Sequence, residues 1–300
     1  MFFKGPPRDT SIRNYPTAPR ASGKRIWELD FLRGFTILLM CIDHFMFDMQ
    51  DSFASAWIAQ GGAARAFARF AEMWWDHGAS WVGQTRDIVQ LIALCIFFGL
   101  CGGSTIFSRD NLSRAMKTFL AAAVISLGTY FAFALDIIRE GNIITFGVLH
   151  MLAISTLIVA AVYHLTRLAK KRADLVFFIA SVVLAGGVFL ADHLIAEAGY
   201  SSNQNLMFLH KTFVITKGGD YFPMIPYLGF AFGGAAVITL LYGSGKSLLP
   251  KLDGAWNKPF RFVGRHTLIV VLVHQIFNML LLACVTAAFV DKGNFVIFPN

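Results

Sequence analysis

The ionisable side chains of residues 25–50 have the types and the spacing of a catalytic or transport site. This apolar stretch carries Asp30, Arg33, Asp43, His44 and Asp48. A charged side chain in hydrocarbon costs about 2.5 kcal/mol or more, so such residues usually face a cavity, a partner or a substrate path. On an α-helix, Arg33 and His44 lie about 20° apart around the axis and about 16 Å apart along it. The spacing predicts a polar stripe that crosses most of a bilayer.

Two kinds of chemistry are combined along this stripe. The imidazole of His44 titrates near neutrality and suits general acid–base work. Asp48 follows one turn later, and we expect its carboxylate to orient the His44 ring and to stabilise the cation. Asp43 is expected to face a neighbouring helix. The guanidinium of Arg33 suits a phosphate, which it can hold through two parallel hydrogen bonds.

The composition indicates an all-α, polytopic membrane protein. Of the 300 residues, 56% are hydrophobic and 15% are charged, with a mean hydropathy of +0.59, whereas soluble domains carry about 25% charged residues. Residues 54–75 are interrupted by glycines and charges, which predicts an interfacial amphipathic helix. Seven apolar segments are long enough to span a bilayer, at about 31–49, 88–107, 118–135, 144–165, 175–191, 222–242 and 264–286.

The distribution of Lys and Arg predicts which ends of the helices face the cytoplasm. Residues 1–25, 108–117, 166–173 and 243–265 hold six, three, four and five of them. The alternate segments 50–87, 136–143, 192–221 and 287–300 hold three, one, two and one. By the positive-inside rule the N-terminus is cytoplasmic and the C-terminus lies outside, which seven spans satisfy. The net charge of +8 is therefore explained by topology, and we expect no nucleic-acid partner.

This topology divides the chain and its polar residues. Residues 1–24 are predicted to form a basic, disordered cytoplasmic tail, and residues 25–300 a single transmembrane domain. The cytoplasmic group consists of arginines and is expected to bind an anion: Arg33, Arg109, Arg114 and Arg265, with Lys258 and Arg261 nearby. The remaining group is rich in His and Asp and lies from mid-depth to the outer side. It is expected to supply the acid–base residues, His44, Asp48 or His77, and the residues that bind the substrate, Asp43, Asp87, His150, Asp220, Tyr221 and His274. His274 is equally explained as a buried residue that holds helices together.

Five motifs carry a resemblance to a known family. They are ELDFLRGFTILLMCIDHFMFD in the first helix, FFGLCGGSTIFSR (Phe97–Arg109), FGVLHMLAIS (Phe146–Ser155), DYFPMIPYLGF (Asp220–Phe230) and FVGRHTLIVVLVHQ (Phe262–Gln275). In this order they resemble the heparan-α-glucosaminide N-acetyltransferase catalytic family, a bacterial branch of which is known as DUF1624. The resemblance covers about residues 25–285. The first helix also resembles the broader transmembrane acyltransferase group.

The resemblance implies acyl transfer from cytosolic acyl-CoA, in the first instance acetyl-CoA, to a sugar amine or hydroxyl on the opposite face. It implies a multi-pass protein of a bacterial inner membrane whose partners are membrane lipid, acyl-CoA and a glycan or glycolipid acceptor; a homo-oligomer is compatible with it. The catalytic histidine of lysosomal members lies in a His-Ala-Ser-Trp loop. WWDHGASWVGQTRD resembles that loop and makes His77 a candidate, whereas His44 fits the bacterial branch. We favour His44, as a base or as an acyl carrier.

Other functions fit parts of the sequence. A proton-coupled secondary transporter would also place His and Asp inside helices, although the odd number of spans and the lack of a visible inverted repeat count against it. An accessory membrane subunit would need no active site. Cys41, Cys95, Cys101 and Cys284 lack metal-ligand spacing and fall inside predicted spans, where they act as small packing residues. No metal is expected, and no P-loop or dinucleotide fingerprint is present.

Overall fold

The computed structural model describes residues 25–199, 203–213 and 219–290, and this part of the chain is built of helices without a β-strand. The predicted tail, residues 1–24, lies outside the described residues, as do residues 291–300. The all-α prediction is confirmed for the described part. The placement of the two termini relative to the membrane stays a prediction.

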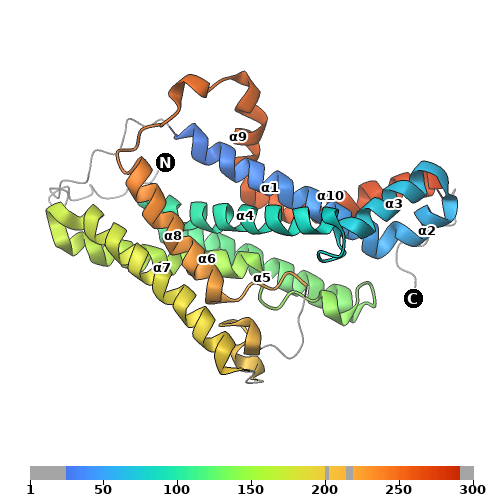
Figure 1. Ribbon diagram of the computed structural model, residues 1–300, viewed down its shortest axis with the longest axis horizontal. Helices are drawn as coiled ribbons and strands as arrows, with labels where there is room; N and C mark the ends of the chain where they lie inside the picture. Colours follow the sequence, from blue (N-terminus) through green and yellow to red (C-terminus); the bar gives the residue numbers. More distant parts are fainter. Residues whose placement is uncertain (1–24, 200–202, 214–218, 291–300) are drawn as a thin grey trace, which may run out of the picture.

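The seven long helices of the described chain run back and forth, and successive connections lie at alternate ends (Figure 1). The short helices are α2 (Ala54–Gln60), α3 (Gly62–Trp74) and α9 (Lys258–Arg265). The long ones are α1 (Trp27–Asp48), α4 (Trp81–Gly103), α5 (Asn111–Ala134), α6 (Val148–Thr166), α7 (Ala173–Ala198), α8 (Met224–Tyr242) and α10 (Thr267–Val285).

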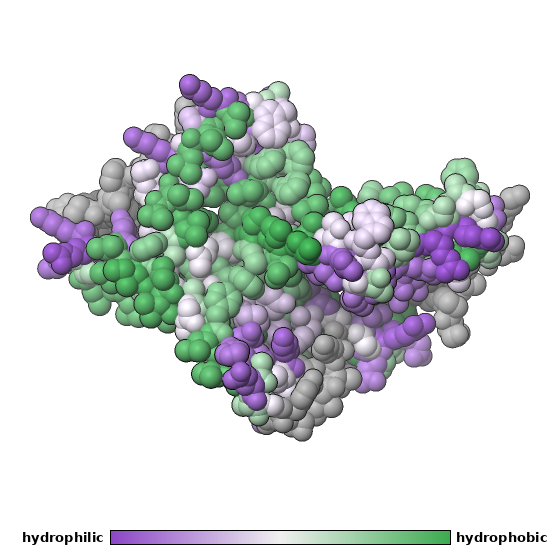
Figure 2. Space-filling model, viewed as in Figure 1, coloured by the Kyte–Doolittle hydropathy of each residue, from purple (hydrophilic) through white to green (hydrophobic). Residues whose placement is uncertain are grey.

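Five segments of the described chain are long and apolar enough to cross a membrane: Trp81–Ile106, Asn111–Ala134, Val148–Ala198, Met224–Tyr242 and Thr267–Val290. The third contains both α6 and α7, so six of the seven predicted spans overlap these segments, with boundaries that differ by a few residues. The first predicted span, in α1, does not, because its charged residues lie too close together. Much of the surface between the helix ends is apolar (Figure 2). The protein is thus an all-helical membrane protein, and the total of seven spans stays a prediction.

The segment expected to form one interfacial helix at residues 54–75 is divided in two. Gly61 and Gly62 take the left-handed φ angles of 83° and 56° that glycine tolerates, and α2 and α3 fold back on each other there. Buried Ala68 and Ala71 of α3 pack in a cluster with Phe53 and with Leu282 of α10. The hairpin therefore covers the ends of α1 and α10 and is part of the folded bundle.

Helices α1 and α9 approach each other closely enough for their backbones to touch. A Cβ atom on Gly34 would lie 1.8 Å from the carbonyl oxygen of Phe260, and one on Gly264 would lie 1.9 Å from that of Asp30. Only glycine fits at these two positions. This contact places Arg265, the residue after Gly264, beside the first turns of α1.

We expect Gly34→Ala to destabilise the protein because the new methyl group overlaps the α9 backbone and forces the helices apart. Overpacking of this kind costs about 1–3 kcal/mol. Gly186→Ala in α7 is the matched control, because a Cβ there meets nothing within 4 Å, and helix propensity favours alanine by about 0.5–1 kcal/mol. Thermal unfolding in detergent would measure both variants. Equal midpoints for Gly34→Ala and the wild type would contradict the close contact.

Candidate functional site

A cavity of about 1260 Å³ opens at the end of the bundle where α4 meets α5 and α6 meets α7. Its lining is strongly basic, and among the described residues only Asp30 and Asp174 contribute carboxylates to it. Arg167 pairs with Asp174 at 2.6 Å. Nine cationic side chains line it: Arg25, Arg33, Arg109, Arg114, Lys117, Arg167, Lys170, Lys171 and Arg265. The excess of positive charge makes this cavity suitable for a ligand with several negative charges.

The buried carboxylate of Asp30 organises one wall of the cavity. Its Oδ1 lies 3.4 Å from Nη1 of Arg33, and its Oδ2 accepts a hydrogen bond of 3.1 Å from Nε of Arg265. Arg25 lies 3.7 Å away. Arg33 also donates through Nη2 to Oγ of Ser104 at 2.7 Å. Because Asp30 and Ser104 fix their position, the two guanidiniums are held at the wall before any ligand arrives.

The deeper part of the cavity is apolar. Phe97 from α4, Leu149 and Leu152 from α6, and Leu268 and Val271 from α10 line it. Cys101 of α4 belongs to this wall, and its Sγ lies 3.3 Å from Oγ1 of Thr156. A basic mouth that leads into an apolar throat suits an amphiphilic anion, with a phosphorylated head and a long, weakly polar arm.

All four arginines predicted to bind an anion line this one cavity: Arg33, Arg109, Arg114 and Arg265. The nearby Lys258 and Arg261 do not, and Arg261 pairs with Asp253. The sequence analysis missed Arg25, Lys117, Arg167, Lys170 and Lys171 as cavity residues. The sequence could have indicated them, since they belong to the clusters of positive charge that we attributed to topology alone.

His44 and His274 meet between α1 and α10. Nδ1 of His44 lies 2.7 Å from Nε2 of His274, and the rings are stacked with centroids 4.9 Å apart. Nδ1 of His274 lies 2.9 Å from the carbonyl oxygen of Val271, a residue of the cavity wall. Val271 thus links the cavity wall to the pair His44–His274.

Asp48 is not the partner of His44. Its Oδ1 accepts a hydrogen bond of 2.6 Å from Nε2 of Gln275, and its Oδ2 is buried without a partner. We expected this carboxylate to orient His44, but the adjacent pairs His44–His274 and Asp48–Gln275 form two separate rungs between α1 and α10. Helix spacing placed Asp48 on the correct face, whereas the choice of partner depends on where α10 crosses α1.

Asp43 faces α3 and α4, as expected of a residue directed at a neighbouring helix. Its carboxylate accepts two hydrogen bonds of 2.8 Å from Arg86 and one of 2.9 Å from Trp74. Arg86 is only 4% exposed and stacks on Trp75 at 3.7 Å. The carboxylate of Asp43 is thus occupied within the protein. Arg86 was missed by the sequence analysis, although its position beside Asp87 at the start of a span was a usable signal.

The rival histidine, His77, lies on the loop that these contacts anchor. Its side chain is exposed, its backbone has a φ angle of 50°, and its ring packs edge-on against Trp75. Asp87 binds Arg86 at 3.0 Å. Since the carbonyl oxygen of Asp43 accepts a hydrogen bond from Trp75, the chain holds the loop of His77 beside the end of α1 that carries His44.

His150, Asp220 and Tyr221 gather instead at the start of α6. His150 stacks on Phe146, and Oδ2 of Asp220 accepts a hydrogen bond of 3.0 Å from the backbone N–H of Val148. Tyr221 donates to the carbonyl oxygen of Met207 at 2.5 Å. Burial raises the pKa of Asp220 to about 6 and that of Tyr221 to about 12. In the described chain, no hydrogen bond or ring contact joins these residues to His44 or His77.

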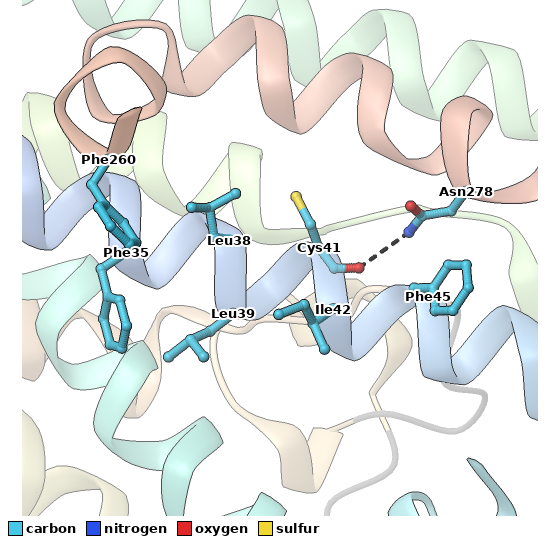
Figure 3. Close-up of a pocket in the computed structure, with 8 residues that line it drawn as sticks. All are labelled: Phe35, Leu38, Leu39, Cys41, Ile42, Phe45, Phe260 and Asn278. Atoms are coloured by element: carbon cyan, nitrogen blue, oxygen red, sulfur yellow. Dashed lines mark hydrogen bonds between the residues drawn. The ribbon is translucent and has the colours of Figure 1, made fainter. Parts of the chain in front are cut away.

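A second, smaller pocket of about 390 Å³ lies along α1 where it faces α9 and α10 (Figure 3). Its one polar side chain is the amide of Asn278, which donates to the carbonyl oxygen of Cys41 at 3.1 Å. The other lining side chains are Phe35, Leu38, Leu39, Cys41, Ile42, Phe45 and Phe260. The pocket offers hydrocarbon contacts and no group for an anion. Among the described residues, no cluster of His, Cys, Asp or Glu could hold a metal ion.

The raised pKa of Asp220 makes a contribution to stability that depends on pH. Between pH 4 and pH 6 the folded protein binds the proton more tightly than the unfolded chain, so this contribution falls as pH rises through that window. Asp220→Asn keeps an oxygen that can accept from Val148. We expect the variant to gain about 1–3 kcal/mol over the wild type at pH 7.5, and this gain to disappear near pH 4. Thermal unfolding across this range would measure it, and a gain independent of pH would contradict it.

One family model matches most of the chain. It describes the catalytic region of heparan-alpha-glucosaminide N-acetyltransferase and covers residues 25–276. A comparison with curated proteins and one with solved structures gave no significant match. The match spans the basic cavity, both candidate histidines and the start of α10. The chain belongs to the heparan-alpha-glucosaminide N-acetyltransferase catalytic family.

Proposed function

We propose that the protein transfers an acyl group, in the first instance acetyl, from acyl-CoA in the basic cavity to an amine or hydroxyl of a sugar on the other side of the membrane. The observation that carries this proposal is the form of the cavity. CoA has a pyrophosphate and a 3′-phosphate at one end and a long pantetheine arm at the other. Nine cations at the mouth suit the phosphates, and the apolar throat suits the arm.

The path from donor to acceptor follows α1. Arg33 lines the cavity, and His44 lies 11 residues farther along the same helix, a rise of about 16 Å. Val271 lines the apolar part of the cavity, and its carbonyl oxygen contacts His274, the partner of His44. A thioester at the end of an extended arm would therefore come close to the histidine pair.

In the proposed reaction His44 acts as the general base. The acceptor nitrogen or oxygen attacks the thioester carbonyl, the new bond to the acyl carbon forms, and the C–S bond breaks with CoA thiolate as the leaving group. His44 takes the proton of the acceptor. A covalent route through acyl-histidine uses the same residue. His44 is favoured over His77 because a second side chain orients its ring, whereas His77 is exposed.

The thiol of Cys101 should report occupation of the cavity. In a variant that keeps only this cysteine, acetyl-CoA should slow alkylation by N-ethylmaleimide at least tenfold, because the pantetheine arm would cover the thiol. A variant that keeps only the exposed Cys284 is the control and should show no protection. Equal labelling of Cys101 with and without acetyl-CoA would contradict a donor site here.

The same assay tests the arginines. Arg33→Gln should raise the acetyl-CoA concentration needed for protection about 10–100-fold, the cost of one charge-assisted hydrogen bond. Arg172→Gln is the control, because Arg172 belongs to the basic turn between α6 and α7 but does not line the cavity. A similar effect of both substitutions would indicate that only overall charge matters.

The two histidines can be separated by turnover. With acetyl-CoA as donor and glucosamine as the probe acceptor in proteoliposomes, His44→Ala should lower kcat about 10²–10⁴-fold while Cys101 remains protected by acetyl-CoA. His77→Ala should retain most activity. The reverse pattern would assign the base to His77. Flux of substrate without acyl-CoA would support the transporter instead, and mass analysis of cell-envelope glycans from cells with and without the gene would identify the natural acceptor.

A further inference from the structure

The contacts of the pair His44–His274 define which ring nitrogens carry a hydrogen atom. A backbone carbonyl oxygen can only accept, so Nδ1 of His274, 2.9 Å from the oxygen of Val271, carries a hydrogen. A neutral His274 then has its lone pair on Nε2. That atom lies 2.7 Å from Nδ1 of His44, so the hydrogen between the rings belongs to His44.

This assignment leaves Nε2 of His44 with a lone pair. Neutral imidazole carries one N–H, and in His44 this N–H is at Nδ1. Among the described residues, no side chain or backbone group forms a hydrogen bond with Nε2 of His44. A lone pair that is free of internal contacts is the state that a general base needs before it meets its substrate.

From this geometry we infer that His274 is the positioning residue that fixes His44 in the Nδ1–H tautomer, so that Nε2 faces the acceptor as the base. The inference rests on the proposed function and deepens it, because it names the atom that takes the proton and the group that prepares it. His274 performs the role for which the sequence suggested Asp48, whose own hydrogen bond goes to Gln275.

His274 also provides a place for the charge that proton transfer creates. When Nε2 of His44 accepts the proton, the ring becomes a cation that still donates through Nδ1 to His274. The hydrogen between the rings can move to Nε2 of His274, which leaves the charge on a ring that already donates to Val271. The two rings can therefore share one positive charge, and the Nδ1–H of His274 stays bonded to Val271 in either arrangement.

Two substitutions at position 274 separate positioning from packing. His274→Gln keeps an oxygen that can accept from Nδ1 of His44, whereas His274→Leu fills similar space without an acceptor. In the full chain in proteoliposomes, with acetyl-CoA and glucosamine, we expect His274→Leu to lower kcat at least 30-fold while KM for acetyl-CoA changes less than threefold. His274→Gln should stay within tenfold of the wild-type kcat. His193→Gln, on the exposed part of α7, is the control and should leave kcat unchanged.

The tautomer itself can be observed by ¹⁵N NMR of protein labelled at histidine, with His44→Gln used to assign the His44 signals. The wild type and His274→Gln should show a protonated Nδ1 and an unprotonated Nε2 at His44, and His274→Leu should show a mixture of tautomers. An unchanged tautomer and an unchanged kcat in His274→Leu, with normal wild-type turnover, would overturn the inference alone. If the wild type neither turned over nor bound acetyl-CoA, the proposed function itself would be overturned.

Discussion

The buried carboxylate of Asp30 is the interaction around which the basic end of the protein is arranged. A carboxylate at this depth is stable only with cationic partners, and a group of like-charged arginines needs an anion to stay together. Asp30 meets both needs by holding Arg33 from its own helix and Arg265 from the end of α9. The arrangement depends on the glycine contact between α1 and α9, because any larger residue would move Arg265 away from Asp30.

Helix α1 then connects this end to the other. It carries Asp30 and Arg33 at the cavity, His44 against α10, and Asp43 against α3 and α4. Its charged residues and His44 are engaged by several neighbouring elements, so the rotation of the helix about its axis is fixed as well as its position. The charges that keep α1 out of the set of simple apolar spans are the same charges that fix its place in the bundle.

The sequence allowed the helical class, six of the apolar spans and the grouping of four arginines to be predicted, because periodicity, hydropathy and charge act locally along the chain. The partners of individual side chains were harder. Asp48 lies one turn from His44, yet its hydrogen-bond partner is Gln275, because α10 packs against α1 at the level of Asp48. The sequence marked Arg86 by its position beside Asp87, but its partner Asp43 is identified only when α4 packs beside α1. Rotation and crossing of helices are set by packing across the whole bundle.

The basic cavity also has a consequence for the protein without its ligand. Several of its cations, Lys117, Lys170 and Lys171 among them, have no carboxylate partner in the described chain, so their mutual repulsion opposes the packing of the segments that carry them. A polyanion removes this repulsion and links the α4–α5 and α6–α7 turns to α1 through a shared counter-charge. Sulfate, phosphate or free nucleotides would then neutralise the cavity in place of the ligand, and the stability of this end of the bundle would depend on the ionic composition of the buffer.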